Sequence, residues 1–234
     1  MKCIIFDTET TGLPQKRAKL KDTSKWPYIV QLSWIIYDDV TNKITHTNDH
    51  IIKINDDIYI PPETIKIHKI TKEISQAMGK PLNDVMDMFL KDLEDSHIIV
   101  GHNIAFDINM VAVEMLRLKR KETLKNHAKI VYCTQNKGLC FTDYHYISKF
   151  NGQRKQKPPK LMELHDTLFN SIPKNLHNAF TDILVCFRCM FYMIYKVDPL
   201  KNNIMINLKI RETKKVIYIK EKKFEDVFNQ ICNL

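Results

Sequence analysis

The chain has 234 residues and carries 36 Lys and Arg against 27 Asp and Glu, a net charge of +9 that suits a protein binding a polyanion. Its length suits one globular domain with a full core, and it contains no repeat or low-complexity tract. The apolar stretch that runs through 190–193 is interrupted by Asp182 and Arg188, and these charges make it too polar to span a membrane.

The first predicted element is a strand over residues 2–7, which leads into the acidic segment 7–12 (Asp-Thr-Glu-Thr-Thr-Gly). Side chains alternate between the faces of a strand, so Asp7 and Glu9 project from the same face, where they can share a divalent cation. An acid pair at a strand end is more often a solvated edge. The pair is therefore informative only together with the rest of the chain.

Two further strands, near 29–38 and 43–54, follow and can pair antiparallel with the first. Helices are predicted near 71–78 and 81–94. From residue 97 onward strands alternate with helices, which suits parallel pairing. The pattern predicts an α/β fold with a mixed sheet flanked by helices.

A strand near 97–101 ends in the tripeptide Gly-His-Asn, and a helix with apolar periodicity is predicted over 103–118. Asn103 is a good N-cap for this helix. Asp107 then lies in its opening turns, close to the strand end that His102 occupies.

After a strand near 129–133 and a helix near 160–170, a strongly apolar helix is predicted over 178–196. His177 precedes this helix and Asp182 lies in its first turns. A carboxylate near a helix N-terminus is electrostatically favoured, so Asp182 alone has an ordinary structural explanation. His177 alone could equally be an interface histidine.

Together these segments resemble the three motifs of the DEDDh 3′→5′ exonucleases, a branch of the RNase H-like superfamily typified by the epsilon proofreading subunit of bacterial DNA polymerase III. A histidine five residues before the last acid is typical of this branch. The resemblance covers about residues 1–197 and includes 60–71, where Lys69 replaces the usual glycine. It implies an RNase H-like sheet and an active site formed by the acids and the histidine: Asp7, Glu9, Asp107, Asp182 and His177.

Phosphodiester hydrolysis needs an activated water and neutralisation of charge on the leaving 3′-oxygen, which two divalent ions about 3.5–4 Å apart can supply. Clustered carboxylates repel one another, and hard oxygen ligands favour two Mg²⁺ ions, with Mn²⁺ as a substitute. The resemblance implies that Asp7 bridges both ions, that Glu9 and Asp182 complete the water-activating site, and that Asp107 holds the second ion. His177 is the candidate general base, because imidazole has a reference pKa of about 6.5.

The resemblance also implies substrate contacts. Thr10, Thr11 and Leu13 match positions that hold the terminal nucleotide, with Leu13 as a wedge between the last two bases. The alternative is that residues 10–12 only form a turn after the strand and do not contact the substrate. His102 and Asn103 are further substrate-binding candidates, and a structural role is open for His102.

Basic residues cluster outside the acidic site. The loops at 16–25 and 150–160 flank segments that carry the motifs, and they are candidates for phosphate contact. The cluster at 117–121, at the end of the central helix, is predicted to be a solvated face.

Residues 198–234 lie beyond the resemblance and form a basic C-terminal extension. Short strands are predicted at 204–206 and 216–219, with an amphipathic helix over 224–234. The extension either packs against the exonuclease domain, residues 1–197, or serves as a docking arm for a polymerase or another replication or repair protein.

The cysteines indicate a reducing compartment. Cys186 and Cys189 lie on a predicted helix and lack a second Cys pair or a spaced His pair, so buried free thiols are expected rather than a zinc site. Met1-Lys2 leads directly into the first strand, so no signal peptide is expected. These features predict a soluble intracellular protein, cytoplasmic or nuclear.

These observations predict a metal-dependent 3′→5′ exonuclease that releases nucleoside 5′-monophosphates from single-stranded or frayed DNA in proofreading, replication or repair. RNA 3′-end trimming is the alternative, because the motifs do not report the 2′-hydroxyl. The third hypothesis is a nucleic-acid-binding or polymerase-associated module without catalysis. Loss of a motif acid would have favoured it, but all four acids are present.

Overall fold

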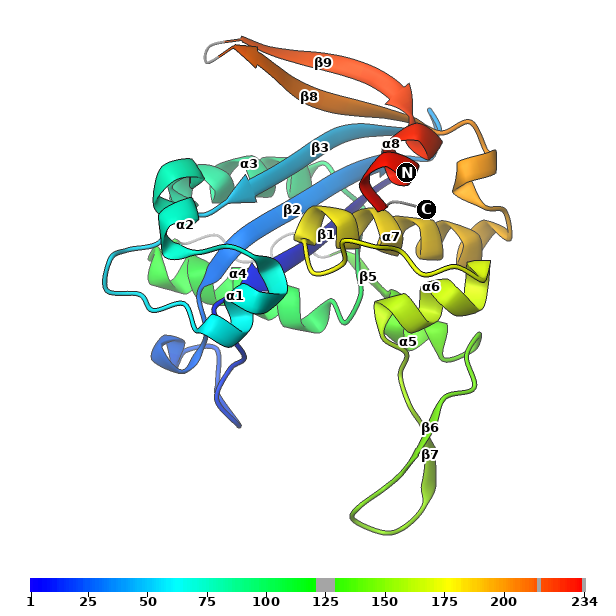
Figure 1. Cartoon of the computed structure of the whole chain (residues 1–234), viewed down its shortest axis with the longest axis horizontal. Helices are drawn as coiled ribbons and strands as arrows, with labels where there is room; N and C mark the ends of the chain where they lie inside the picture. The colour runs from blue at the N-terminus through cyan, green and yellow to red at the C-terminus, as the bar shows by residue number, and fades with distance from the viewer. Residues whose placement is uncertain (121–128, 214–215, 233–234) are drawn as a thin grey trace.

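A computed structural model describes residues 1–120, 129–213 and 216–232. Its centre is a twisted seven-stranded sheet with helices on both faces (Figure 1). In spatial order the strands are β5 (Ile130–Cys133), β4 (Ile98–Gly101), β1 (Lys2–Thr10), β2 (Ile29–Asp38), β3 (Lys43–Ile51), β8 (Met205–Thr213) and β9 (Val216–Lys223).

The strand pairing confirms the predicted mixed sheet. β1 pairs antiparallel with β2, and β2 pairs antiparallel with β3. β4 pairs parallel with β1 on its other side, and β5 pairs parallel with β4. This is the arrangement of an RNase H-like sheet, and it brings the carboxyl ends of β1, β4 and β5 to one edge.

Alternation along β1 divides the core between the two faces of the sheet. Ile4 and Phe6 face a cluster that includes Trp34 of β2, whereas Cys3 and Ile5 face a second cluster on the opposite side. The first cluster is covered by α3 (Leu82–Glu94) and α4 (Ala105–Arg117), and the second by α6 (Leu161–Phe169), α7 (Ala179–Tyr195) and α8 (Phe224–Cys232).

Several elements differ from the predicted ones. The third strand ends at Ile51, and α1 (Pro62–His68) precedes the expected α2 (Lys72–Met78). The expected loop at 150–160 forms part of a separate two-stranded hairpin, β6 (His145–Ile147) and β7 (Arg154–Gln156), which follows the short helix α5 (Thr134–Gly138). These elements are too short for hydrophobic periodicity to reveal them.

Asn103 is not the N-cap of α4, contrary to the prediction. The N-cap position is Ile104, without a side-chain hydrogen bond, and Asn103 adopts a left-handed conformation with φ +62°. Asparagine tolerates this region better than most residues. Asn103 therefore forms the turn between β4 and α4 and does not cap the helix.

The C-terminal extension continues the main sheet. After the 3-10 turn Pro199–Lys201, β8 pairs parallel with β3 over Lys43↔Met205 and Ile44↔Ile206, and then β8 and β9 form a long antiparallel hairpin. Helix α8 returns the chain onto α7. The last predicted position of the final helix, Leu234, lies outside the described residues.

Cys186 and Cys189 are free and buried in α7, as predicted. Among the described helices, none combines the length and apolar character that crossing a membrane requires.

Candidate active site

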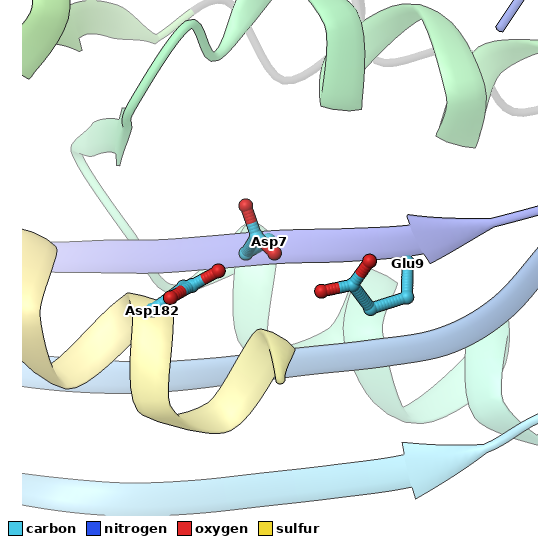
Figure 2. Close-up of side chains that lie close together, drawn as sticks. All are labelled: Asp7, Glu9 and Asp182. Atoms are coloured by element: carbon cyan, nitrogen blue, oxygen red, sulfur yellow. The ribbon is translucent and has the colours of Figure 1, made fainter. Parts of the chain in front are cut away.

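Three carboxylates converge at the carboxyl end of β1. Ligand oxygens from Asp7, Glu9 and Asp182 all lie within 4.8 Å of one another (Figure 2). Asp7 and Glu9 lie on the same face of β1, as the strand periodicity predicted, and Asp182 comes from the first turn of α7. Residues 175 positions apart in the chain therefore form one acidic group.

The start of α7 is fixed by local capping and by β2. Asn178 is the N-cap, and its side-chain oxygen accepts hydrogen bonds from the N–H groups of Phe180 and Thr181. The side-chain oxygen of Gln31 on β2 accepts from Ala179 N–H at 3.3 Å. Gln31 is buried and donates in turn to Asp49 at 2.7 Å. Sequence reasoning missed this role of Gln31, because only the sheet register places it beside Glu9.

His177 lies immediately before this capped turn. It adopts a left-handed conformation, with φ +68°, and its side chain is exposed. Its backbone N–H points to both carboxylate oxygens of Asp182, at 3.4 and 3.3 Å. The structure therefore couples the histidine to the acid through the backbone and leaves the imidazole accessible.

Asp107 lies next to the acidic group but is turned toward β1. Its Oδ1 accepts hydrogen bonds from the N–H of Thr8 at 3.0 Å and from the Thr8 hydroxyl at 2.7 Å. It is buried in the first turn of α4. Asp107 thus joins the second motif to the first strand, and it is not one of the three acids within 4.8 Å of one another.

Burial raises the pKa of all four acids. The pKa of Asp7 lies well above its usual value, because of desolvation and then repulsion from Asp107, Asp182 and Glu9. Desolvation followed by repulsion from Asp182 and Asp107 raises the pKa of Glu9 to about 8. Desolvation also raises the pKa of Asp107 and of Asp182 to about 7, although hydrogen bonds from Thr8 and His177 oppose it. A donor set of crowded carboxylate oxygens fits a divalent cation, whose charge offsets this repulsion.

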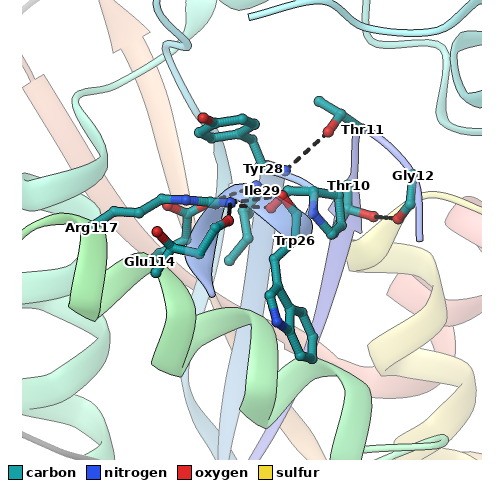
Figure 3. Close-up of polar contacts among 10 residues, drawn as sticks. Thr10, Thr11, Gly12, Trp26, Tyr28, Ile29, Glu114 and Arg117 are labelled. Carbon is teal, nitrogen blue, oxygen red and sulfur yellow. Dashed lines mark hydrogen bonds and ion pairs between the residues drawn. The ribbon is translucent and has the colours of Figure 1, made fainter. Parts of the chain in front are cut away.

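The segment after Glu9 is held by its own hydroxyls. The Thr10 hydroxyl donates to Gly12 O at 2.7 Å, and the Thr11 hydroxyl accepts from Tyr28 N–H at 2.9 Å (Figure 3). Both threonines are buried, whereas Leu13 is 83% exposed. Among these three predicted contacts, Leu13 is the apolar side chain that projects into solvent.

Arg117 departs from the predicted solvated face. Its side chain is 14% exposed, and its guanidinium donates to the carbonyls of Thr23, Trp26 and Pro27 (Figure 3). It also pairs with Glu114 at 2.7 Å. The basic pattern predicted only a charged helix end, because nothing local identifies carbonyls some 90 residues away as partners. Lys121 of the same cluster lies outside the described residues.

Glu114 on α4 adds a further contact to the loop that Arg117 holds. Its Oε1 accepts from Ile29 N–H at 3.1 Å, and the Arg117 guanidinium lies 3.9 Å from the centre of the Tyr28 ring. Tyr28 in turn exchanges backbone and hydroxyl hydrogen bonds with Thr11. The end of α4 therefore fixes the segment that holds Thr11 in place.

His102 has partners within the protein for both ring nitrogens. Burial lowers its pKa to about 4, so the imidazole is neutral at physiological pH. Nε2 lies 3.0 Å from the carbonyl of Pro159 and must carry the proton, and Nδ1 lies 3.0 Å from the Thr134 hydroxyl. Asn103 beside it is exposed. In this structure His102 joins the second motif to the segment before α6, and Asn103 has the more accessible side chain.

Comparison with known proteins agrees with this geometry. The model of a protein family described as "Exonuclease" (RNase_T) matches residues 4–190. No curated protein sequence matches the chain.

Solved structures of exonuclease I share the fold. Escherichia coli exonuclease I in complex with a dT13 oligonucleotide matches with a TM-score of 0.61 and 17% identity, over 84% of this chain and 41% of that one. Its zinc-bound complex with single-stranded DNA gives 0.62 and 17%, over 86% and 43%. Exonuclease I from Methylocaldum szegediense gives 0.59 and 16%, over 86% and 43%. The chain spans about two-fifths of the length of these proteins, 41–43%.

Proposed function

Because the chain belongs to the exonuclease (RNase_T) family, whose model matches residues 4–190, we propose that it is a metal-dependent 3′→5′ exonuclease of the DEDDh type. Its products are nucleoside 5′-monophosphates, released from single-stranded or frayed DNA. The observation that carries the proposal is the convergence of Asp7, Glu9 and Asp182 oxygens within 4.8 Å.

The four acids are the metal ligands in this proposal. Asp7, Glu9 and Asp182 would hold one divalent ion, and Asp107 with Asp7 would hold a second. Mg²⁺ is the first choice because every donor is a hard carboxylate oxygen, and Mn²⁺ is the expected substitute. When bound, such ions supply a nucleophilic water at neutral pH and stabilise charge on the leaving oxygen.

His177 serves as the general base. Its imidazole is exposed, so water can reach it, and its backbone N–H is anchored to Asp182 at 3.3 Å. The imidazole of a histidine whose backbone is anchored beside the acidic group is a suitable acceptor for the proton of the attacking water. The anchoring limits the movement of the histidine backbone relative to the acids.

The residues after Glu9 hold the terminal nucleotide. The exposed Leu13 acts as the wedge between the last two bases, on a segment that Thr10 and Thr11 keep rigid. Asn103 is the exposed residue of the second motif and contacts the substrate in this proposal. His102 has a structural role, because its ring is bonded to the carbonyl of Pro159.

DNA is the proposed substrate, in proofreading, replication or repair. Support comes from the motif resemblance to epsilon proofreading subunits, and from exonuclease I, whose structures contain a dT13 oligonucleotide and single-stranded DNA. We assign catalysis to residues 1–197. The basic extension, residues 198–234, packs on this domain through α8, and we propose its outward-facing surface as the docking site for a polymerase or another replication or repair protein. An intracellular location belongs to the same proposal.

The proposal is tested with matched 5′-labelled single-stranded DNA and RNA oligonucleotides in Mg²⁺, with Asp7→Ala as the contamination control. We expect a DNA ladder that shortens from the 3′ end. Preferential shortening of RNA would move the protein to RNA 3′-end trimming. Activity no greater than that of Asp7→Ala on both substrates would contradict catalysis, and binding of nucleic acid without hydrolysis would then favour a binding module.

A further inference from the structure

The β6–β7 hairpin projects from the body of the molecule, below α5 and α6 in Figure 1. Its base is firmly attached. The side-chain amide of Gln156 donates to the carbonyls of Leu139 and Thr142 at 2.6 and 2.8 Å, and Lys157 N–H donates to Tyr144 O at 2.7 Å. The base of this hairpin, which we call the arm, is therefore fixed to residues 139–144.

The far end of the arm combines apolar and basic side chains. Phe150 at the tip is 98% exposed, and Tyr146 and Ile147 on β6 are also exposed. Between Asp143 and Glu163 the chain contains no acidic residue. Its basic residues are Lys149, Arg154, Lys155, Lys157 and Lys160.

Lys157 pairs with Glu163 at 2.7 Å, whereas the other four cations form no ion pair with a residue that the structure describes. Of these four, Lys160 lies beyond the hairpin, at the start of α6. Lys149, Arg154 and Lys155 remain on the hairpin, and the Arg154 guanidinium lies 3.1 Å from His145 Nδ1. A hairpin that only needed solubility would not gather three large exposed apolar side chains within five positions. An exposed aromatic ring at the tip of a hairpin that carries cations and no acids fits single-stranded nucleic acid, whose bases stack and whose phosphates are negative.

The arm leaves the molecule from the edge that carries the acids. β5 runs parallel to β4 and β1, so its carboxyl end, which leads through α5 into the hairpin, lies at the same edge as Asp7 and Glu9. The base of the arm is also tied to the second motif, because His102 Nε2 donates to Pro159 O at 3.0 Å. Ligands of α/β sheets bind at this edge.

We propose that the β6–β7 hairpin binds the single-stranded part of the substrate on the 5′ side of the nucleotide in the active site. Phe150 stacks on a base, and Lys149, Arg154 and Lys155 contact phosphates. This inference rests on the proposed function for the path of the strand, and it adds a binding element outside the four acids and the histidine.

The test measures binding of the full-length chain to fluorescein-labelled oligothymidylates of 3 and 20 nucleotides in EDTA, where metal-dependent hydrolysis cannot occur. Base stacking on an aromatic residue contributes about 1–3 kcal/mol by alanine substitution. We therefore expect Phe150→Ala to weaken binding of the 20-mer by about 5- to 150-fold. The ratio of the 20-mer affinity to the trimer affinity should fall accordingly.

A triple variant, Lys149→Gln/Arg154→Gln/Lys155→Gln, tests the phosphate contacts separately. For single strands, each phosphate contact contributes about 0.7 to the slope of log K against log salt, so the slope should decrease by about 2. The matched control is Lys91→Gln/Lys201→Gln/Lys220→Gln, which removes the same charge from exposed positions on other elements. This control should retain the salt slope of the wild type.

Equal 20-mer affinities for the wild type and both hairpin variants would overturn the inference and leave the apolar tip to a protein partner. Undetectable 20-mer binding by the wild type would also overturn it. Failure of the proposed function is recognised separately, since it appears as absent Mg²⁺-dependent hydrolysis while binding through the arm persists.

Discussion

At the scale of single residues, the acids of the site bind protons that the unfolded chain would release. Burial and repulsion raise the pKa of Glu9 from 4.5 to about 8, and desolvation raises those of Asp107 and Asp182 from 3.8 to about 7. Without a cation, the folded protein either keeps these carboxyl groups protonated or contains carboxylates that repel one another. A bound divalent ion offsets the repulsion, so the carboxylates can ionise in the folded state.

The stability of the metal-free protein should therefore fall as pH rises from about 6.5 to about 8. In this range the native acids bind more protons than the unfolded chain, so the free energy of unfolding decreases by up to about 1.4 kcal/mol per pH unit for each proton. Below pH 6.5 the decline is partly offset, because burial lowers the pKa of His68, His102 and His165, and such histidines stabilise the fold as pH rises.

Urea unfolding in EDTA at pH 6.5, 7.2 and 8 measures this dependence. Mg²⁺ should reduce or reverse the decline, since it binds the ionised acids of the folded state. Glu9→Gln should give a shallower decline in EDTA. A metal-free stability that is constant or rises over this range would contradict the assigned pKa shifts.

Asp182→Asn should abolish hydrolysis and yet stabilise the metal-free protein. Asparagine keeps the shape of the side chain and removes one buried charge, which should raise the free energy of unfolding by about 1–3 kcal/mol at pH 8 in EDTA. Asp57→Asn is the control, because Asp57 is exposed in a loop. Destabilisation by Asp182→Asn would instead make Asp182 a structural residue.

His177→Ala tests the general base. We expect kcat to fall by about 10²- to 10⁴-fold, with little change in affinity for the oligonucleotide, because the exposed imidazole makes no hydrogen bond to a described residue. His46→Ala, at an exposed position on β3, provides the control. A parallel loss of binding would argue for substrate positioning.

At the scale of elements, the last turn of α4 acts as a clamp on the loop before β2. Arg117 joins three loop carbonyls to Glu114, and Tyr28 passes this restraint to Thr11. The segment that holds the terminal nucleotide in our proposal is therefore supported from a helix whose other end carries Asp107.

Arg117→Met should destabilise the protein by about 3 kcal/mol, because it leaves buried carbonyls and Glu114 without their partner. KM for an oligonucleotide should rise more than kcat falls, because Thr11 loses its support. Arg117→Lys should recover little, since an ammonium group cannot span the three carbonyls.

Arg120→Met is the matched control, because the Arg120 side chain is covered to the same degree, 13% exposed, but its partners Asn83 and Asp87 lie on α3 rather than in the loop before β2. This variant should leave KM unchanged. Chemical denaturation and steady-state kinetics of the three variants measure both effects. An equal rise in KM for Arg117→Met and Arg120→Met would contradict the clamp.

At the scale of the whole molecule, the C-terminal extension belongs to the second hydrophobic core. Phe224 and Phe228 of α8 are fully buried, and the Phe224 ring lies 5.1 Å from that of Phe187 on α7. Arg188 of α7 lies over the Phe228 ring at 5.0 Å. These contacts cover the apolar side of the helix that carries Asp182.

Phe228→Ala should therefore destabilise the chain by about 3–5 kcal/mol, as for other buried phenylalanines. Phe150→Ala provides a matched control, because the same deletion at an exposed position should change the free energy of unfolding by less than about 0.5 kcal/mol. Thermal or urea unfolding compares the two. A small effect of Phe228→Ala would show that α8 packs only loosely.

Long elements with strong apolar patterns were predictable. β2 and α7 were expected within one or two residues of their observed bounds, because their own side chains specify alternation or helical periodicity. α1, α5 and the β6–β7 hairpin were not predicted, because elements this short depend on tertiary contacts. Gly138 at the end of α5, for example, packs against Leu164 and Pro159, where a Cβ would lie 3.0 Å from their side-chain atoms.

The sequence by itself determined that Asp7 and Glu9 share one face of a strand and that Asp107 and Asp182 lie in the first turns of two helices, because strand alternation and helical periodicity are local. Their assignment to one site with His177 came from the family resemblance and stays a prediction. Only the tertiary structure decided that Asp7, Glu9 and Asp182 meet within 4.8 Å while Asp107 bonds to Thr8, and that the half-buried Arg117 clamps the loop before β2. Those features depend on contacts between residues about 90 to 175 positions apart, which chain folding creates and local periodicity does not encode.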